Sequence, residues 1–523
     1  MNYRSSDLHS NDVTIVGLRY NDTMTVSAGT NKELYNIALV SDFFCPNAGG
    51  VETHMYFLAQ CLRQLGHKVV VITHAYGERR GICYLSNGLK VYYLPFLVVY
   101  NGCSLATIIG SLPWLRKIFL RERIQLIHGH ATFSSMAHEA MFNGWLMGIR
   151  TVFTDHSLFG FADASAILTN TLVLQYSLSN VDRVICVSYT SKENTVLRGK
   201  LDPRKVFTIP NAIETRLFYP DPEQFYGNPT TIIFLGRLVY RKGADLLCAI
   251  IPKVCDRHPQ VRFIVGGDGP KRLELEEMRE KYHLHSRVTL LGILPHNVVR
   301  EVLVQGQSDR YLVTYTKLDR IVWIPDFHQH VINGSVLHEH RRGRQLLHVV
   351  STRVGGVPEV LPADFISLEE PVPELLVEAL SEAIQKRESG ELMDPVQKHR
   401  AVSNMYNWPD IAKRTEVVYR DAMREPTPQW RSGLKKYADQ GIGFGILYIT
   451  VALINMFFLT VLEFFDPASA NPLANDIPES KQTSNCTAEV PADVTSTTFQ
   501  ECSRNHRRNF GMRLRSVAKA PSK

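Results

Sequence analysis

The chain has 523 residues, of which 45% are hydrophobic and 21% are charged, and its formal net charge is +7. This length allows several domains, and the composition is ordinary for a chain that buries large cores. The lysines and arginines are scattered, without a sustained basic stripe or a nucleic-acid fold motif, so we expect no nucleic-acid partner and favour phosphates or acidic headgroups. Residues 1–34 are polar and lack an apolar signal region, which predicts a disordered N-terminal tail.

A βαβ unit with a glycine-rich loop is predicted near the N-terminus. The apolar run 36–41 is typical of a buried parallel strand, 51–65 has helical periodicity, and 68–73 is predicted to be the next strand. Gly49 and Gly50 stand just before the helix, where bare backbone N–H groups and the helix dipole favour an anion. A plain tight turn would use the same residues, so this motif alone leaves both interpretations open.

The second half of the chain repeats this pattern with basic residues at a strand end. A strand at 231–236 runs into Arg237, Lys242 precedes a helix at 244–254, and 262–270 is predicted to be a strand that closes in a glycine-rich turn. Fixed positive charge on the arginine and mobile charge on the lysine suit a diphosphate. The alternative is that these basic residues only solvate the end of the strand. This alternative is weaker because open α/β sheets bind ligands at the carboxyl ends of their strands.

Four short motifs mark the sequence, and longer stretches surround them. The motifs are Gly49-Gly50-Val51-Glu52, His128-Gly129-His130, Gly236-Arg237 with Lys242, and Gly355-Gly356-Val357-Pro358-Glu359. The longer stretches include 41–77, 128–140, 154–167, 188–198, 209–214 and 351–362. On these residues the chain resembles retaining glycosyltransferases that use nucleotide sugars, and within them the group that starts glycosylphosphatidylinositol (GPI) anchors. The resemblance covers roughly 36–305 and 349–462.

The resemblance implies an α/β fold of two facing Rossmann-like domains, the arrangement called GT-B. We expect an acceptor domain at 35–215 and a donor domain at 216–425. It also implies transfer of N-acetylglucosamine from UDP-GlcNAc to phosphatidylinositol, with retention at the sugar, in a complex with other subunits at the endoplasmic reticulum membrane. UDP-GlcNAc is the donor substrate, and no separate cofactor is expected.

Roles for individual residues follow from the same resemblance. The expected catalytic residues are His130, Arg237 and Lys242, with the basic pair stabilising charge on the leaving phosphate. Because no Asp-x-Asp stands in a metal position, we expect no metal. The expected donor-binding residues are Gly49, Gly50, Gly236, Gly267 and Glu359, and Glu52, Asp155 and His156 are placed on the acceptor side. Glu52 has a structural alternative, which is to cap the helix that follows the loop.

A membrane-spanning helix is predicted at 442–462, because this stretch is long enough to cross a bilayer and Asn455 is its one strong polar interruption. A buried helix of a globular domain is the alternative. Basic residues precede the stretch and acidic residues follow it: Arg431, Lys435 and Lys436, then Glu463 and Asp466. The positive-inside rule therefore predicts cytosolic catalytic domains and a lumenal tail at 463–523, where Asn485 begins an N-x-T sequon.

Segment 306–348 departs from the family pattern. The family carries two glutamates eight positions apart here, which hold hydroxyls of the donor, whereas this segment contains Glu339 as its sole glutamate. It also has a cluster of histidines and arginines whose spacing does not suit a metal site. An out-of-frame or alternatively spliced exon would explain the abrupt change. Two further readings stay open: a catalytically impaired or dead subunit of the same complex, and a related lipid glycosyltransferase with another sugar.

Overall fold

The computed structural model describes residues 33–47, 49–100, 102–107, 109–157, 169–212, 228–294, 309–315, 348–389, 391, 401–402, 404–426 and 429–474. The chain divides into two units, Met1–Leu34 and Tyr35–Lys523, and every helix and strand below belongs to the second. The expected N-terminal tail and most of the expected lumenal tail lie outside the described residues.

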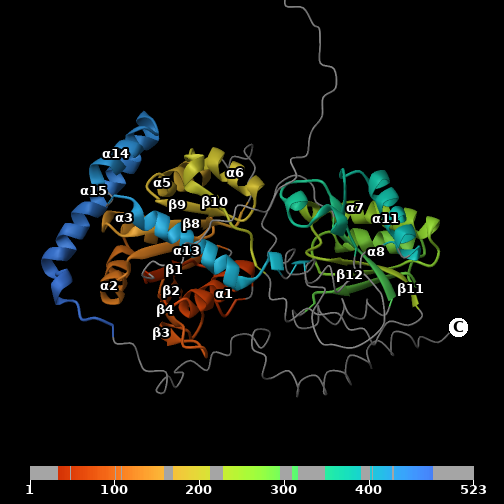
Figure 1. The fold of residues 1–523 in the computed structure, drawn as a ribbon, viewed down its shortest axis with the longest axis horizontal. Helices are drawn as coiled ribbons and strands as arrows, with labels where there is room; N and C mark the ends of the chain where they lie inside the picture. Colours follow the sequence, from red (N-terminus) through yellow and green to blue (C-terminus); the bar gives the residue numbers. More distant parts are fainter. Residues whose placement is uncertain are drawn as a thin grey trace, which may run out of the picture. The chain divides into compact units, whose positions relative to one another are not determined.

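The first domain is built on an eight-stranded sheet in the order β10-β9-β8-β7-β1-β2-β4-β3, in which β3 alone runs antiparallel to its neighbour (Figure 1). The strands are β1 (Asn36–Val40), β2 (Lys68–His74), β3 (Gly81–Tyr84), β4 (Lys90–Leu94), β7 (Leu126–His130), β8 (Arg150–Asp155), β9 (Arg183–Cys186) and β10 (Val206–Thr208). The central strands are buried almost throughout, because helices cover both faces of the sheet. This explains why they appear in the sequence as continuous apolar runs.

Short connections and helices complete this domain. They are α1 (Gly50–Gln64), the hairpin β5 (Val98–Tyr100) with β6 (Cys103–Ser104), α2 (Leu112–Glu122), α3 (Ser135–Leu146), the π-helix η1 (Thr169–Gln175), α5 (Tyr176–Leu178), α6 (Tyr189–Gly199) and the 3₁₀ turn η2 (Pro203–Lys205). The predicted strand, helix and strand of the first βαβ unit are confirmed as β1, α1 and β2.

The second domain holds a six-stranded parallel sheet in the order β13-β12-β11-β14-β15-β16. Its elements are β11 (Asn228–Leu235), η5 (Tyr240–Lys242), α7 (Ala244–Arg257), β12 (Arg262–Gly266), α8 (Arg272–Lys281), β13 (Val288–Gly292), β14 (Asp309–Tyr315), β15 (His348–Thr352), η6 (Val357–Glu359), η7 (Ala363–Phe365), β16 (Ile366–Glu369) and α11 (Pro373–Glu388). The predicted strand at 231–236 is present as β11, the stretch 262–270 begins with β12, and the helix predicted at 244–254 is α7.

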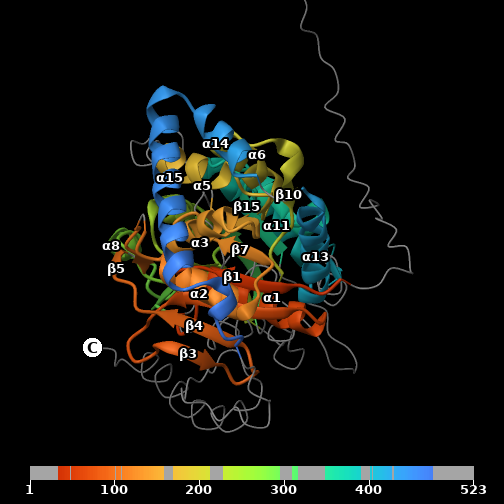
Figure 2. The same ribbon diagram turned by 90° about the vertical axis from the view of Figure 1, so that its left-hand side faces the viewer.

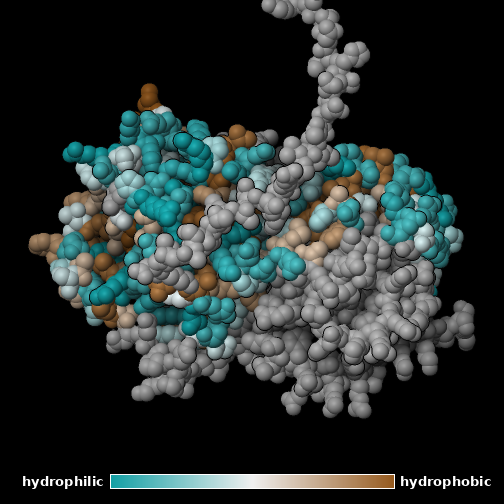
Figure 3. All heavy atoms as spheres, in the orientation of Figure 1, coloured by the Kyte–Doolittle hydropathy of each residue, from teal (hydrophilic) through white to brown (hydrophobic). Residues whose placement is uncertain are grey.

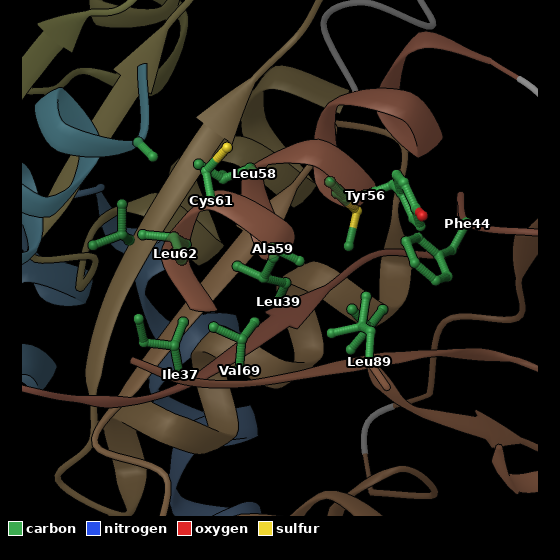
Figure 4. Packing of buried hydrophobic residues seen from close by; sticks show 14 of the residues in the cluster. Ile37, Leu39, Phe44, Tyr56, Leu58, Ala59, Cys61, Leu62, Val69 and Leu89 are labelled. Atoms are coloured by element: carbon green, nitrogen blue, oxygen red, sulfur yellow. The ribbon is translucent and has the colours of Figure 1, made fainter. Parts of the chain in front are cut away.

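Helix α13 (Trp408–Arg424) leaves the second domain and joins the core of the first. Its apolar face packs with α1 in one cluster that also contains residues of β1 and β2. Figure 4 shows part of that cluster, where side chains of α1 such as Leu58 and Leu62 lie over Ile37 and Val69 of the strands. The range 216–425 was expected to form a separate donor domain. Its last helix, α13, contributes to the core of the first domain instead.

Two C-terminal helices, α14 (Trp430–Ala438) and α15 (Ile442–Phe465), pack beside α3 (Figure 2). Trp145 of α3 contacts Tyr437, and Tyr437 contacts Tyr448 of α15. Among the described residues, α15 is the one helix long and apolar enough to cross a membrane. Its polar residue Asn455 is buried, whereas many apolar side chains are exposed along the helix; hydrophobic atoms are visible at the left edge of Figure 3.

The far end of α15 is also tied to the first domain. Arg116 of α2 is buried and pairs with Glu463 and Asp466 at the C-terminal end of α15. In this structure, which contains no membrane, α15 therefore lies along the domain over most of its length. The helix itself extends over the predicted stretch 442–462 and three residues beyond it.

A buried ion pair joins β8 to α6 in the first domain. Arg198 and Asp155 are both buried, with Nη2 to Oδ2 at 2.9 Å. Replacing Arg198 with Met should lower the free energy of unfolding by about 3 kcal/mol or more, because the carboxylate stays buried without its cation. The measurement is thermal and urea unfolding of the detergent-purified chain, followed by circular dichroism.

Arg204→Met is the matched control for this prediction. Arg204 pairs with Asp202 at a similar distance, 2.7 Å, but its side chain is exposed, so its loss should leave stability almost unchanged. Equal destabilisation by the two substitutions would show that burial of the Arg198 pair is not what stabilises this part of the domain.

Candidate functional site

The glycine loop stands where the sequence predicts it. Gly49 is the residue before α1, has extended backbone angles and caps the helix without a side chain. The Glu52 carboxylate folds back over it, and a Cβ atom on Gly49 would lie 2.3 Å from Glu52 Oε2. An acidic side chain in the first turn of a helix is favourable because the dipole is positive there. Glu52 is buried in this position, which agrees with the structural alternative considered for it.

Three buried histidines gather at the carboxyl edge of the first sheet. His130 ends β7, His156 follows β8, and His54 comes from α1. His130 Nδ1 and His156 Nε2 are 3.3 Å apart and form a hydrogen bond, and the ring centroids of His54 and His156 are 4.8 Å apart. The resemblance named His130 and His156 but not His54. One signal could have found it: His54 stands one helical turn after Gly50 and so points to the same side of α1.

Burial lowers the pKa of all three imidazoles. The pKa of His54 falls to about 4, while those of His130 and His156 lie well below the usual value because burial and the neighbouring rings both oppose a positive charge. These histidines are therefore neutral at pH 7 and act as hydrogen-bonding groups. Their ligand nitrogens lie within 4.8 Å of one another, which would also suit a metal ion. In this structure, a hydrogen bond joins His130 Nδ1 to His156 Nε2, so these two rings already contact each other directly.

The first histidine of the His128-Gly129-His130 motif has a different environment. His128 Nδ1 lies 2.7 Å from the Tyr419 hydroxyl of α13, and its Nε2 lies 2.6 Å from Thr154 Oγ1. Both nitrogens are thus engaged within the core. His128 holds α13 against the strand that carries His130, so the two histidines of one motif have separate tasks.

Asp155, placed on the acceptor side by resemblance, is a structural centre in the first domain. Its Oδ1 accepts hydrogen bonds from Thr132 Oγ1 and Ser157 N, and its Oδ2 accepts from Thr195 Oγ1 and Arg198. The carboxylate is fully buried and each oxygen has two donors. Its direct effect is to fix the turn after β8, and that turn carries His156.

The basic pair stands at the carboxyl end of β11. Arg237 follows the strand and is exposed, and Lys242 lies one turn later, before α7. Gly236 and Gly267 shape the turn: Gly236 N donates to Gly266 O, and a Cβ atom on Gly267 would lie 1.8 Å from Gly236 O. Gly267 has a φ of +131°, which other residues rarely adopt. The two glycines therefore let the ends of β11 and β12 approach closely, beside the two cations.

Glu359, expected to bind the donor, has protein partners in this structure. Its carboxylate accepts hydrogen bonds from the backbone N–H groups of Tyr189 and Thr190, at 2.6 and 3.0 Å, and from Thr190 Oγ1. It thus occupies the N-terminus of α6. A donor hydroxyl would have to compete with these hydrogen bonds.

Part of the atypical segment is described. Residues 309–315 form β14, whose backbone pairs in parallel with β11 and β15. The segment therefore supplies the strand that this position of the sheet requires, although its sequence departs from the family pattern. Glu339 and the clustered histidines before residue 348 lie outside the described residues.

Two protein-family models match parts of the chain. One, described as PIGA (GPI anchor biosynthesis), matches residues 74–163. The other, described as Glycosyl transferases group 1, matches residues 216–315. The first lies in the domain with the histidine cluster, and the second contains the basic pair.

Solved structures with the same fold are more distant in sequence. A glycosyltransferase from Rickettsia africae ESF-5 aligns with a TM-score of 0.58 and 14% identity, covering 76% of this chain and all of that one. Anabaena Alr3699/HepE, solved with UDP and glucose, aligns with a TM-score of 0.55 and 16% identity, covering 74% of this chain and 99% of that one. At this identity the likeness shows the fold, which is that of GT-B glycosyltransferases.

Curated relatives match most of the chain. A phosphatidylinositol N-acetylglucosaminyltransferase subunit of Homo sapiens is 48% identical over 443 residues, which are 84% of this chain and 88% of the human protein. The phosphatidylinositol N-acetylglucosaminyltransferase gpi3 subunit of Schizosaccharomyces pombe is 43% identical over 431 residues, 82% of this chain and 90% of the yeast protein. The chain therefore belongs to the PIGA and GPI3 family of phosphatidylinositol N-acetylglucosaminyltransferase subunits, which are glycosyltransferases.

Proposed function

We propose that this chain transfers N-acetylglucosamine from UDP-GlcNAc to phosphatidylinositol, with other subunits of a transferase complex, as the first step of GPI-anchor synthesis. The names of its relatives support the acceptor and the sugar. The observation that carries the chemistry is the pair Arg237 and Lys242 beside the glycine turn at the end of β11. There, two cations and bare backbone can surround a diphosphate.

The reaction breaks the bond between the sugar and the phosphate, so negative charge grows on the leaving diphosphate. Arg237 and Lys242 stabilise that charge more in the transition state than in the ground state, which lowers the barrier. A hydroxyl of the inositol ring attacks from the same face of the sugar, as retention requires. The Gly49-Gly50 loop adds backbone N–H groups at the N-terminus of α1.

The histidine cluster is assigned to the acceptor side of this reaction. A neutral imidazole can accept a hydrogen bond from a hydroxyl or donate one to a sugar oxygen. His130 and His156 have this neutral form because of their burial. Both rings are fully enclosed in this structure, so contact with a substrate requires a neighbouring side chain to move.

The second candidate function is a catalytically impaired subunit of the same complex. The observation in its favour is the atypical segment, whose sole glutamate is Glu339 where the family has two. Without that pair the donor's hydroxyls lose their carboxylate partners. Strand β14 keeps the sheet continuous, so a folded but inactive protein is consistent with this segment.

For the membrane, we propose that α15 spans the bilayer, with the catalytic domains in the cytosol at the endoplasmic reticulum. A helix of 24 residues is about 36 Å long and exceeds the roughly 30 Å hydrocarbon core. Insertion would separate Arg116 from Glu463 and Asp466, since these residues would then stand on opposite sides of the bilayer. The docked and the spanning positions of α15 are thus mutually exclusive.

Substitution of the basic pair tests the chemistry. In a chain that carries the usual family sequence at 306–348, Arg237→Ala or Lys242→Ala should lower turnover roughly 100-fold or more, because the leaving phosphate loses a stabilising charge. The measurement is transfer of radiolabelled sugar in microsomes. Arg262→Ala is the control, since Arg262 is also exposed but begins β12 at the opposite end of the sheet. If Arg237→Ala and Lys242→Ala both keep activity close to that of the unsubstituted enzyme, the assignment is refuted.

Complementation tests the atypical segment. The chain as written should fail to restore GPI-anchored proteins at the surface of a cell that lacks its own copy of this subunit. The same chain with the family's usual segment in place of 306–348 should restore them, because it regains the two glutamates. Surface staining by flow cytometry measures the result. Full rescue by the chain as written would show that another carboxylate takes their role.

Protease protection tests the orientation. A tag at the C-terminus should survive protease treatment of sealed microsomes and disappear once detergent is added, because the tail at 463–523 is lumenal. Asn485→Gln should then remove any glycan detected on the tail. Digestion of the tag without detergent would place the tail in the cytosol and favour the docked position, in which Arg116 keeps its partners.

A further inference from the structure

The histidine cluster is the one group among the described residues whose donor atoms are placed to hold a metal ion together. His54, His130 and His156 each offer one ring nitrogen, and these three nitrogens lie within 4.8 Å of one another. The rings come from α1, from β7 and from the turn after β8, so the fold brings them together from three separate elements. All three side chains are buried.

The separation of two of the rings fits a tetrahedral metal site. His130 Nδ1 and His156 Nε2 are 3.3 Å apart, which is longer than most hydrogen bonds. Zn²⁺ binds imidazole nitrogens tetrahedrally at about 2.0–2.1 Å, so two nitrogens on one ion stand roughly 3.3–3.4 Å apart. These two rings can therefore share an ion with little movement. His54 needs a larger shift, which rotation of its side chain can supply.

Two ring nitrogens of the cluster are buried without a hydrogen-bond partner. They are His130 Nε2 and His54 Nδ1, and neither meets a donor or an acceptor in the described part of the chain. Asn211 lies beside His54 but does not bond to this nitrogen. Buried polar groups nearly always have a partner, so an incompletely bonded group of imidazoles points to a ligand that they bind jointly. A divalent transition-metal ion is such a ligand, and imidazole suits Zn²⁺ well.

We propose that the histidine cluster binds one Zn²⁺ ion through one nitrogen of each of its three rings. Three protein ligands leave the fourth tetrahedral position for a water molecule. The hydrogen bond between His130 and His156 is given up, and the proton in it moves to the far nitrogen of its own ring, because a protonated ring nitrogen cannot bind a metal. No group is oxidised or reduced, and each imidazole keeps one proton.

The bound ion inhibits the transferase. This part of the inference rests on the proposed function, in which His130 and His156 offer their lone pairs to the acceptor side. The ion takes those lone pairs, so the acceptor loses its hydrogen-bond partners. Arg237 and Lys242 stand at the end of β11 in the second domain, and the ion does not replace them. Binding of the ion itself requires no substrate.

Titration of the purified full chain with Co²⁺ tests the site. The chain carries no histidine tag and is first stripped of metal with a chelator. Tetrahedral Co²⁺ absorbs visible light, so one equivalent should produce an absorption band that Zn²⁺ then abolishes. His54→Gln should weaken binding roughly tenfold or more, since loss of even an outer-shell partner costs that much. His138→Gln is the matched control, because His138 is buried in the same domain but lies outside the cluster, so binding should stay unchanged.

The histidines of segment 306–348 are the competing ligands. A chain with His338→Gln and His340→Gln should bind Co²⁺ as the unsubstituted chain does. X-ray absorption of that chain with one equivalent of Zn²⁺ makes the test independent of how well His54→Gln folds. It should show three imidazole nitrogens at about 2.0–2.1 Å. Absence of the band, equal binding by a folded His54→Gln chain, loss of binding with the two segment histidines, or ligation by sulfur each overturns the proposal.

An activity assay separates this inference from the proposed function. In microsomes that contain a chain with the usual family segment, free Zn²⁺ at a concentration that saturates the site should lower sugar transfer roughly tenfold or more, and a chelator should restore it. His54→Gln should resist inhibition relative to its own metal-free activity, whereas His138→Gln should stay sensitive. Transfer that saturating Zn²⁺ leaves unchanged overturns the inference. Metal binding by the cluster in a chain without any transferase activity would refute only the proposed function.

Discussion

The buried carboxylate of Asp42 organises the edge of the first sheet at which the three buried histidines gather. It follows β1 and accepts hydrogen bonds from Ser104 N, from Ser134 Oγ and from Met136 N. Its own carbonyl accepts from Thr73 Oγ1 and from the Tyr76 hydroxyl. One residue thereby joins the loop after β1 to the β5–β6 hairpin, the start of α3 and the end of β2. A carboxylate this deeply buried persists only because its acceptor positions are filled.

This arrangement explains why polar residues concentrate at one edge of an otherwise apolar sheet. Parallel strands end together, and their last residues have lost their ladder partners, so hydrogen bonds must come from side chains. Asp42 serves the loops around β1, and Asp155 serves those around β8. The neutral histidines lie between these two centres. Their low pKa values and their closeness follow from the same burial.

Local patterns in the sequence predict much of this fold. The buried strands, the helix after Gly49-Gly50 and the cations after β11 follow from periodicity and glycine placement, and the structure confirms them. Contacts between distant segments were beyond that reasoning. The return of α13 to the first domain buries its apolar face there and brings Tyr419 into a hydrogen bond with His128, 291 positions away. Likewise, the sequence alone does not distinguish an aspartate that binds substrate from one that, like Asp155 here, accepts hydrogen bonds from four donors of the protein.

The pairing of α15 with the first domain shows the same limit. Hydropathy identifies the helix, but it says nothing of Arg116, whose charge is compensated by the end of a helix more than 300 residues away. Sequence patterns alone do not show which distant residues will pair with an arginine on α2. In the docked position, α15 gains the ion pairs of Arg116 and apolar contacts with the first domain. In the spanning position, it gains solvation of its apolar side chains by lipid instead.

The glycine turn between β11 and β12 has a consequence for how donor recognition is divided. Gly236 and Gly267 lie so close that no side chain can enter between them, so under the proposed function a diphosphate at this turn would meet backbone and two cations. Under the proposed function, the hydroxyls of the donor are recognised elsewhere, since in the family that task belongs to the two glutamates that segment 306–348 lacks. The proposed contacts of the diphosphate and those of the donor's hydroxyls therefore come from different parts of the second domain. Replacement of that segment would then remove the donor's carboxylate partners while the backbone and the two cations at the turn stay in place.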